Sequence, residues 1–120
     1  MIRTIALASC VALSGCASKG LYQWGGYEEQ LYSAYKDPTK VETLRLKLEA
    51  LLQEAQQSGR RVAPGLYAEL GTVYLQGGNR PQAIRFYDLE RKTWPESTLL
   101  MTSMIQNLER LEKGTQGEKP

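Results

Sequence analysis

Apolar side chains recur every three or four residues over most of this chain, and that spacing constrains its fold more than any other feature. The clearest run is a stripe of six apolar residues: Val41, Leu44, Leu48, Leu51, Leu52 and Ala55. Such spacing is typical of an amphipathic α-helix, whereas a half-buried strand would alternate at every second residue. The stripe therefore predicts a core-facing helix. Ser58-Gly59 predicts its end, because glycine readily adopts the left-handed backbone that stops a helix.

A shorter helix is predicted before this one. Its apolar face repeats every four residues: Tyr27, Leu31 and Tyr35. Asp37-Pro38 follows, and a proline disfavours helix in the residue before it while suiting the first turn of the next helix. Asp37 is therefore a candidate N-cap for the second helix. A capping box formed by Thr39 and Glu42 is the alternative.

Residues 64–97 combine small and large side chains at offsets that suit two antiparallel helices. Gly71 and Ala83 are small where the two helices would cross closely. Four larger residues would fill the space around that crossing: Tyr67, Leu70, Tyr74 and Tyr87. Gly77-Gly78-Asn79 predicts the turn between the helices, with Asn79 as N-cap of the second.

This register resembles the tetratricopeptide (TPR) repeat, in which aromatic, small and turn residues stand at set positions over 34 residues. The matching positions are Tyr67, Leu70, Gly71, Tyr74, Gly78, Ala83, Tyr87 and Pro95. One position departs, because Glu90 stands where the repeat has alanine. We expect either that the next helix packs less closely there or that the helix rotates outward near its end.

A last apolar stripe predicts a helix that caps the others. It consists of Leu100, Met104, Leu108 and Leu111, with Ile105 beside it. The polar residues 114–120 are expected to form a disordered tail. The predicted fold class is therefore all-α, a short TPR-like helical-hairpin solenoid of about five helices over residues 27–113.

The N-terminus has the features of a signal peptide over residues 1–15. Arg3 precedes an apolar run from Thr4 to Leu13 that is about half of the roughly 20 residues needed to span a bilayer. Leu13, Ser14, Gly15 and Cys16 follow in order, and this motif resembles the bacterial lipobox. An ordinary signal peptide with an incidental cysteine is the alternative.

The lipobox resemblance implies cleavage before Cys16, with Leu13, Ser14 and Gly15 as the cleavage-site residues and palmitate-type lipid on the cysteine. Several acyl chains would anchor the protein stably to a membrane. The following Ala17-Ser18 favours the periplasmic face of the outer membrane over the inner membrane. Residues 16–26 would then be the lipidated N-terminus and tether of a lipoprotein.

Two aromatic residues, Tyr22 and Trp24, stand out in this tether. They are candidates for docking a partner or the membrane interface. The simpler interpretation is that both rings fold back onto the chain's own helices, with Gly25-Gly26 as the turn. We favour the second.

The chain has few residues for catalysis. It has no histidine, and its two cysteines are Cys10, in the signal peptide, and Cys16. Thiol–histidine catalysis, Ser–His–Asp chemistry and Cys/His zinc sites are therefore excluded, and we expect no metal or cofactor beyond the covalent lipid. The remaining enzymatic alternative is a carboxylate-dependent cell-wall enzyme, with Glu28, Glu29 and Glu69 as its candidates.

The charge balance, 15 Lys and Arg against 13 Asp and Glu, gives no basic footprint for nucleic acid. The groove-facing positions of the repeat, Gly65, Ala68, Thr72, Leu75 and Gln76, are uncharged, which argues against a clamp for a peptide carboxylate. Arg60-Arg61 is either a solvated loop or a binder of phosphate or anionic lipid, and the loop is the more common case.

Residues 20–113 resemble a small family of uncharacterised Gram-negative lipoproteins. Tyr22 to Tyr27 and Pro64 to Gly71 carry this likeness. The resemblance implies a partner similar to the curli-secretion-pore lipoprotein, since members tend to be encoded beside one. The predicted function is a non-enzymatic, lipid-anchored adaptor or assembly protein that binds another envelope protein. A structural envelope lipoprotein without a dedicated partner is the alternative.

Overall fold

The computed structural model describes residue 22 and residues 24–117, and this part of the chain is helical throughout, without strands. Its five α-helices are α1 (Tyr27–Lys36), α2 (Val41–Gln57), α3 (Leu66–Gln76), α4 (Arg80–Thr93) and α5 (Thr98–Gln116). The short 3₁₀ helices η1 (Pro38–Lys40) and η2 (Pro95–Ser97) lead into α2 and α5. The predicted all-α fold of about five helices is confirmed. The predicted signal peptide and Cys16 lie outside the described residues.

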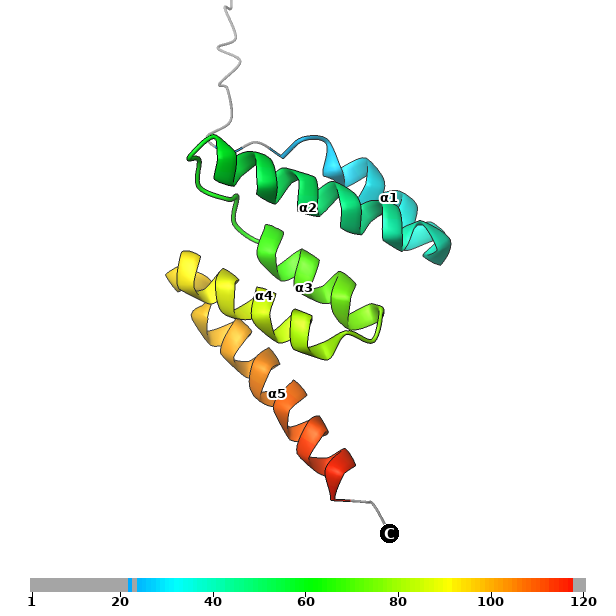
Figure 1. Cartoon of the computed structure of the whole chain (residues 1–120), viewed down its shortest axis with the longest axis vertical. Helices are drawn as coiled ribbons and strands as arrows, with labels where there is room; N and C mark the ends of the chain where they lie inside the picture. Colours follow the sequence, from blue (N-terminus) through cyan, green and yellow to red (C-terminus); the bar gives the residue numbers. More distant parts are fainter. Residues whose placement is uncertain (1–21, 23, 118–120) are drawn as a thin grey trace, which may run out of the picture.

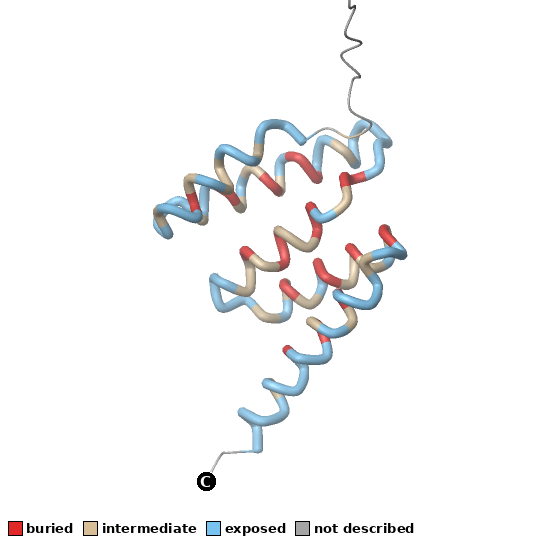
Figure 2. Tube along the Cα trace, turned by 180° about the vertical axis from the view of Figure 1, so that it is seen from behind, coloured by how far each residue is buried: buried red, intermediate tan, exposed pale blue. Residues whose placement is uncertain are grey.

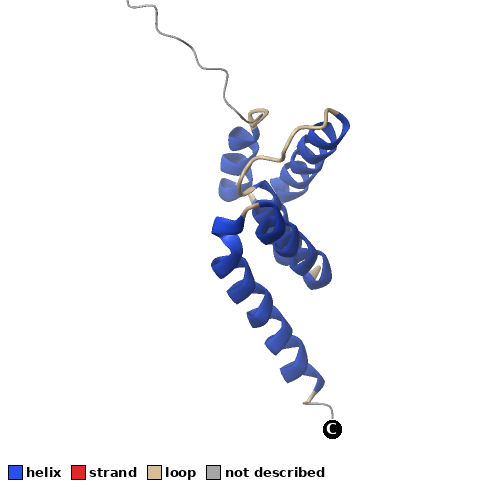
Figure 3. Cartoon of the chain, turned by 90° about the vertical axis from the view of Figure 1, so that its left-hand side faces the viewer, coloured by secondary structure: helices blue, strands red, loops and turns tan. Residues whose placement is uncertain are grey.

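The helices are stacked in chain order, each packing against the next (Figure 1). The α3–α4 hairpin lies in the middle, with α1 and α2 on one side and α5 on the other. Seen from the side, α5 slants away from the other helices toward the C-terminus (Figure 3). This packing is compatible with a short helical solenoid.

Two side chains predicted as N-caps, Asp37 and Asn79, accept hydrogen bonds from backbone N–H groups at the starts of helices. The Asp37 carboxylate accepts hydrogen bonds from the Thr39 N–H at 3.0 Å and from the Thr39 hydroxyl at 2.7 Å. Asp37 therefore caps η1, which leads into α2, and not α2 itself as predicted. The N-cap of α2 is Lys40, whose side chain makes no capping hydrogen bond. The Asn79 side chain accepts from the Gln82 N–H at 3.2 Å, which confirms it as the N-cap of α4.

The apolar stripe of α2 faces the core as predicted. Leu44, Leu48, Leu51 and Leu52 are buried, while Val41 and Ala55 are partly buried at the two ends. The prediction for α1 is partly wrong, because Tyr35 is 88% exposed and Ala34 is the buried residue. Eight residues from Tyr27 to Tyr35 turn a helix about 80° past two full turns, whereas seven residues bring Ala34 back to the same face.

The α3–α4 hairpin closes around Gly71. A Cβ atom on Gly71 would lie 2.7 Å from the Tyr87 ring and 3.2 Å from the Ala83 carbonyl oxygen. Ala83 and Tyr87 are themselves fully buried. The predicted close crossing is therefore present, and glycine is needed for it because no larger residue fits.

Glu90 corrects the expectation drawn from the repeat pattern. Its side chain neither rotates outward nor leaves a loose contact, because the residue is only 1% exposed. One carboxylate oxygen accepts hydrogen bonds from the Gly65 N–H at 2.8 Å and from the Ser97 hydroxyl at 3.2 Å. These donors satisfy that oxygen, and a buried polar group is tolerated when it is hydrogen-bonded. The other carboxylate oxygen, Oε2, is buried without a hydrogen-bond partner among the described residues.

The buried face of α5 also differs from the predicted stripe. Met101, Ile105 and Leu108 are buried, whereas Leu100 is 62% and Leu111 is 57% exposed. The apolar band of α5 is wider than α4 can cover, so one edge of it stays open. Figure 2 shows that burial ends before the last turns of α5.

The predicted disordered tail begins too early. α5 continues to Gln116, through the first residues of the segment 114–120. The Thr115 hydroxyl donates to the Leu111 carbonyl at 2.8 Å, and the Gly117 N–H donates to the Lys113 carbonyl at 3.2 Å. Polar residues therefore extend this helix through its own hydrogen bonds. Residues 118–120 lie outside the described part.

Candidate functional site

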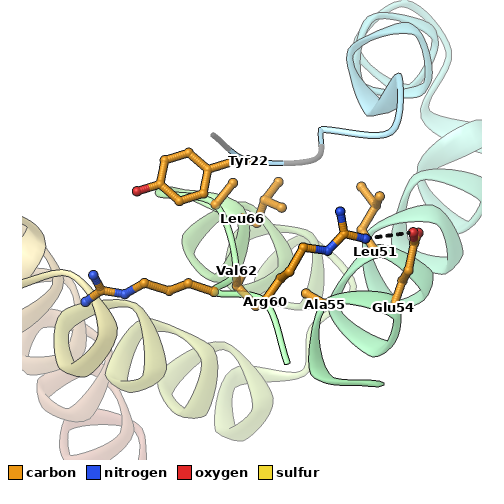
Figure 4. A pocket seen from close by; sticks show the side chains of 9 residues that line it. Tyr22, Leu51, Glu54, Ala55, Arg60, Val62 and Leu66 are labelled. Atoms are coloured by element: carbon orange, nitrogen blue, oxygen red, sulfur yellow. Dashed lines mark hydrogen bonds and ion pairs between the residues drawn. The ribbon is translucent and has the colours of Figure 1, made fainter. Parts of the chain in front are cut away.

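A cavity of about 290 Å³ opens beside the loop that connects the end of α2 to the start of α3. Its apolar walls are Leu51 and Ala55 of α2, Val62 and Ala63 of the connecting loop, Leu66 of α3, and Tyr22. Glu54, Arg60 and Arg61 supply the charged groups. Figure 4 shows Tyr22 beside Leu66 on one side of the cavity and Leu51 on the other.

Two glycines determine the backbone path of the loop between α2 and α3. Gly59 has a left-handed backbone (φ +64°), and the Arg60 N–H donates to the Ala55 carbonyl at 2.9 Å, which closes the end of α2 as predicted. Pro64 then favours extended backbone in the preceding residues, and Val62 and Ala63 are buried. Gly65 (φ +87°) turns the chain into α3. This path places two arginines outside and two apolar residues inside.

Tyr22 lines this cavity, and the chain turns at Gly25 and Gly26 before α1. Gly25 and Gly26 both have positive φ angles, and a Cβ atom on Gly25 would lie 2.3 Å from a methyl carbon of Leu51. The Tyr22 ring meets Trp94 edge to face, with ring centroids 5.5 Å apart. Trp24 stacks on Tyr27 at 6.1 Å and remains 37% exposed. Both rings thus contact their own domain, as the favoured interpretation predicts.

The two arginines have different partners. The Arg60 guanidinium donates to Glu54 at 3.4 Å (Figure 4). It also donates to the Ser58 hydroxyl at 3.0 Å. Both members of the Arg60–Glu54 pair are 52% exposed, and such surface pairs contribute about 1 kcal/mol or less. The Arg61 guanidinium lies 4.2 Å over the Trp94 ring and donates to the Thr93 carbonyl at 2.6 Å. Among the described residues, no carboxylate pairs with Arg61.

The cavity therefore combines an apolar floor with a cationic rim. Its lining holds two guanidinium groups and one carboxylate, so the local charge favours an anion. Guanidinium groups bind phosphate and carboxylate oxygens through paired N–H donors. The arrangement suits binding of an anionic, partly apolar group.

Comparison with known families matches residues 21–104, from the start of this site to the middle of α5, to the family described as Domain of unknown function (DUF4810). The chain belongs to this family. All residues that line the cavity lie inside the DUF4810 span. Comparison with curated proteins and with solved structures found no match.

Within the DUF4810 domain, most residues of the repeat register serve the core. Tyr67, Leu70, Gly71, Ala83 and Tyr87 are buried, and Tyr74 is partly buried against Phe86. Gly78 forms the turn with φ +79°, and Pro95 begins η2. None of these residues lines the cavity, so the predicted register and the site are separate features.

The predicted groove positions are largely used by the domain itself. Ala68 and Leu75 pack against the buried cluster formed by α4 and α5. The hydroxyl groups of Thr72 and Tyr87 share a hydrogen bond at 3.0 Å. The Gly65 N–H is bonded to Glu90, which leaves Gln76 as an exposed polar residue at the end of α3.

The candidate carboxylates of the enzymatic alternative lie around Tyr27. Glu28 and Glu29 are exposed on α1, and Glu69 is half-buried on α3. Burial raises the pKa of Glu69. The pKa of the Tyr27 phenol is also raised, mainly by burial and to a smaller extent by the negative charges of Glu69 and Glu28. Glu29 instead lines a second, polar cavity of about 290 Å³ with Lys40 of η1.

Trp94 contacts two residues of the site without lining the cavity itself, and the sequence did not reveal this role. It is 6% exposed and supports both Tyr22 and Arg61. An aromatic residue directly before Pro95 was the available signal. Within the described residues, no group of His, Cys, Asp and Glu suits a metal ion, and no helix is long and apolar enough to cross a membrane.

Proposed function

We propose that this DUF4810 chain is a lipid-anchored adaptor that binds another envelope protein through its helical scaffold. Its anchor would be the lipid on Cys16, after cleavage at Leu13-Ser14-Gly15, and its place the periplasmic face of the outer membrane. The small stack of helices would hold the partner, and no catalysis is required of it. The lipobox-like motif supports the anchor, and the open face of α5 supports the partner.

The observation that carries the adaptor proposal is the open apolar edge of α5. Leu100 and Leu111 are 62% and 57% exposed, and Met104 lies between them on the same helix face. Four and seven residues separate Met104 from Leu100 and Leu111, so the three side chains share one face of α5, with Met104 partly buried between two exposed leucines. Contiguous exposed apolar surface is a mark of protein interaction sites.

The position of the stripe indicates what it would bind. α5 is the last described helix of the stack and packs on one side against α4. In a longer TPR-like array, the next helix would cover the other side. We therefore propose that the partner supplies an apolar helix to this face. A lipoprotein similar to the curli secretion pore is the first partner to test, because of the family resemblance.

Site-specific photo-crosslinking in cells tests this proposal. A photoreactive residue at Leu100 or Leu111 should give one defined adduct with an envelope protein, identifiable by mass spectrometry. The same residue at Glu109, on the opposite face of α5, is the matched control. The Leu100→Ser/Leu111→Ser variant should lose partner binding, whereas Leu46→Ser on α2, equally exposed, should retain it. Equal adducts from all positions would refute the proposal.

The anchor needs its own test. Labelled palmitate should be incorporated into the wild-type chain, and Cys16→Ala should abolish both labelling and membrane association. A native polypeptide with an unmodified Cys16 thiol, recovered free of membranes, would contradict the anchor.

If Cys16 is lipidated but no α5 adduct forms, the better hypothesis is a structural lipoprotein without a dedicated partner. The carboxylate enzyme has one observation in its favour, which is the raised pKa of Glu69 near Tyr27 and Glu28. Peptidoglycan cleavage by the purified chain, lost in Glu69→Gln, would establish that alternative.

A further inference from the structure

We propose that the cavity beside Arg60 and Arg61 binds the phosphate headgroup of an anionic lipid in the leaflet that holds the Cys16 anchor. The domain would then rest on the membrane with its α2–α3 loop toward the lipid. This inference rests on the proposed lipid anchor. It adds an orientation and a ligand class that the adaptor proposal does not require.

The length of the tether places the cavity near the membrane. Tyr22 lines the cavity and stands six residues after Cys16. Six residues span about 20 Å when fully extended. With Cys16 held in the leaflet, the cavity therefore lies within about 20 Å of the headgroups, and every shorter path of the tether brings it closer.

The charges of the rim fit a phosphate. Arg61 has no carboxylate partner among the described residues, and its guanidinium is held in place over Trp94. Arg60 is paired with Glu54 only at 3.4 Å and in solvent, so it is able to exchange that partner for a stronger anion. Each of these guanidinium groups is able to bind phosphate oxygens from its own side of the rim, and anionic leaflets attract cationic residues that lie at their surface.

The apolar floor of the cavity fits the glycerol and the first acyl carbons that lie next to the phosphate in a lipid. Leu51, Ala55, Val62 and Leu66 form an apolar surface below the arginines. A volume of about 290 Å³ is at the lower end for ligand pockets, and it suits a glycerol phosphate with the first carbons of its chains. Tyr22 at the rim belongs to the residue types that favour the membrane interface, as does the exposed Trp24 nearby.

The test uses the native lipidated chain in lipid nanodiscs. One set contains only zwitterionic phosphatidylcholine, and the other contains phosphatidylglycerol as well. Amide hydrogen exchange over residues 58–66 should be slower in the anionic discs by up to roughly thirtyfold, because each of two cationic side chains contributes about 1 kcal/mol at an anionic surface. Exchange in the α3–α4 turn, residues 77–79, is the internal reference and should not differ.

Variants separate the arginines from the fold. Arg60→Gln/Arg61→Gln should abolish the dependence on anionic lipid, whereas the charge-conserving Arg60→Lys/Arg61→Lys should retain much of it. Arg85→Gln/Arg110→Gln removes the same charge from distant exposed positions and should leave the dependence intact. Because Arg61 also contacts Trp94, Arg60→Gln alone is included, and it should weaken the dependence while shifting the thermal unfolding midpoint by only a few degrees at most.

Each outcome has a distinct meaning. An unmodified Cys16 in the intact-mass spectrum would defeat the proposed anchor and, with it, this inference. A lipidated chain with equal exchange in both discs would overturn the lipid site alone and leave the adaptor proposal standing. Two further results would overturn the lipid site. One is that millimolar inorganic phosphate slows the exchange of residues 58–66 equally well in neutral discs. The other is that the slowing requires an added acidic protein instead of anionic lipid.

Discussion

The carboxylate of Glu90 accepts a hydrogen bond from the backbone N–H of Gly65 at 2.8 Å, although the two residues lie 25 positions apart. The Ser97 hydroxyl donates to the same oxygen. One buried side chain thus joins the loop before α3, the end of α4 and η2. These are also the segments that support the cavity, because Arg61 and Tyr22 rest on the neighbouring Trp94.

Replacing Glu90 tests this connection. Glu90→Ala should lower the free energy of unfolding by about 3 kcal/mol, because it leaves the Gly65 N–H and Ser97 hydroxyl without their acceptor and opens a cavity. Glu90→Gln keeps an acceptor oxygen and should cost about 1 kcal/mol or less. Urea unfolding measures both. Glu96→Ala, exposed on η2, is the control, and a cost for Glu90→Ala as small as that of this control would show the contact to be unimportant.

The role of Glu90 illustrates what the sequence is unable to reveal. The face of α2 was predictable because apolar residues occupy every turn, so the periodicity is unambiguous. Glu90 has its partner in a backbone N–H of a distant loop, and no residue pattern encodes such a donor. On α5 the apolar band covers more than one face, so its sequence did not determine which edge would be buried.

The candidate site was predictable only in part. Arg60-Arg61 was visible as a charged pair, and Gly59 correctly indicated the end of α2. Tyr22, which lines the cavity, contacts Trp94, and these residues are 72 positions apart in the sequence. Spacing within one helix carries no information about such a contact.

Two glycines inside helices should respond in opposite ways to alanine. Gly71→Ala should destabilise the fold by about 2 kcal/mol, because its Cβ atom would lie 2.7 Å from the Tyr87 ring. Gly114→Ala meets no atom within 4 Å and should stabilise α5 by about 0.5 kcal/mol through helix propensity. Thermal unfolding followed by circular dichroism compares them. Similar changes in both variants would mean that the α3–α4 crossing is looser than described.

Glu69 should make stability depend on pH. Burial raises its pKa in the folded state, so the folded protein binds this proton more tightly than the unfolded chain does. Its contribution to stability is therefore favourable below the unfolded pKa and is lost as the pH rises through the raised folded pKa. Glu69→Gln should remove this dependence and increase stability at pH 7. Urea unfolding at a series of pH values measures it, with Glu109→Gln on the exposed face of α5 as control; an unchanged pH profile in Glu69→Gln would refute the assignment.

Trp94 provides a direct report on the contacts that form the site. The chain has two tryptophans, so Trp24→Phe leaves Trp94 as the sole emitter. Its ring is 6% exposed between Tyr22 and Arg61, and its fluorescence should therefore lie at short wavelength. In this background Tyr22→Ala and Arg61→Ala should each shift the emission to longer wavelength and cost about 1 kcal/mol, since each removes one contact with the ring. Tyr32→Ala, at an exposed position on α1, should change neither quantity. If Tyr22→Ala leaves the emission of Trp94 in place, the N-terminal segment does not cover this tryptophan in solution, and the cavity loses the wall that links it to the tether.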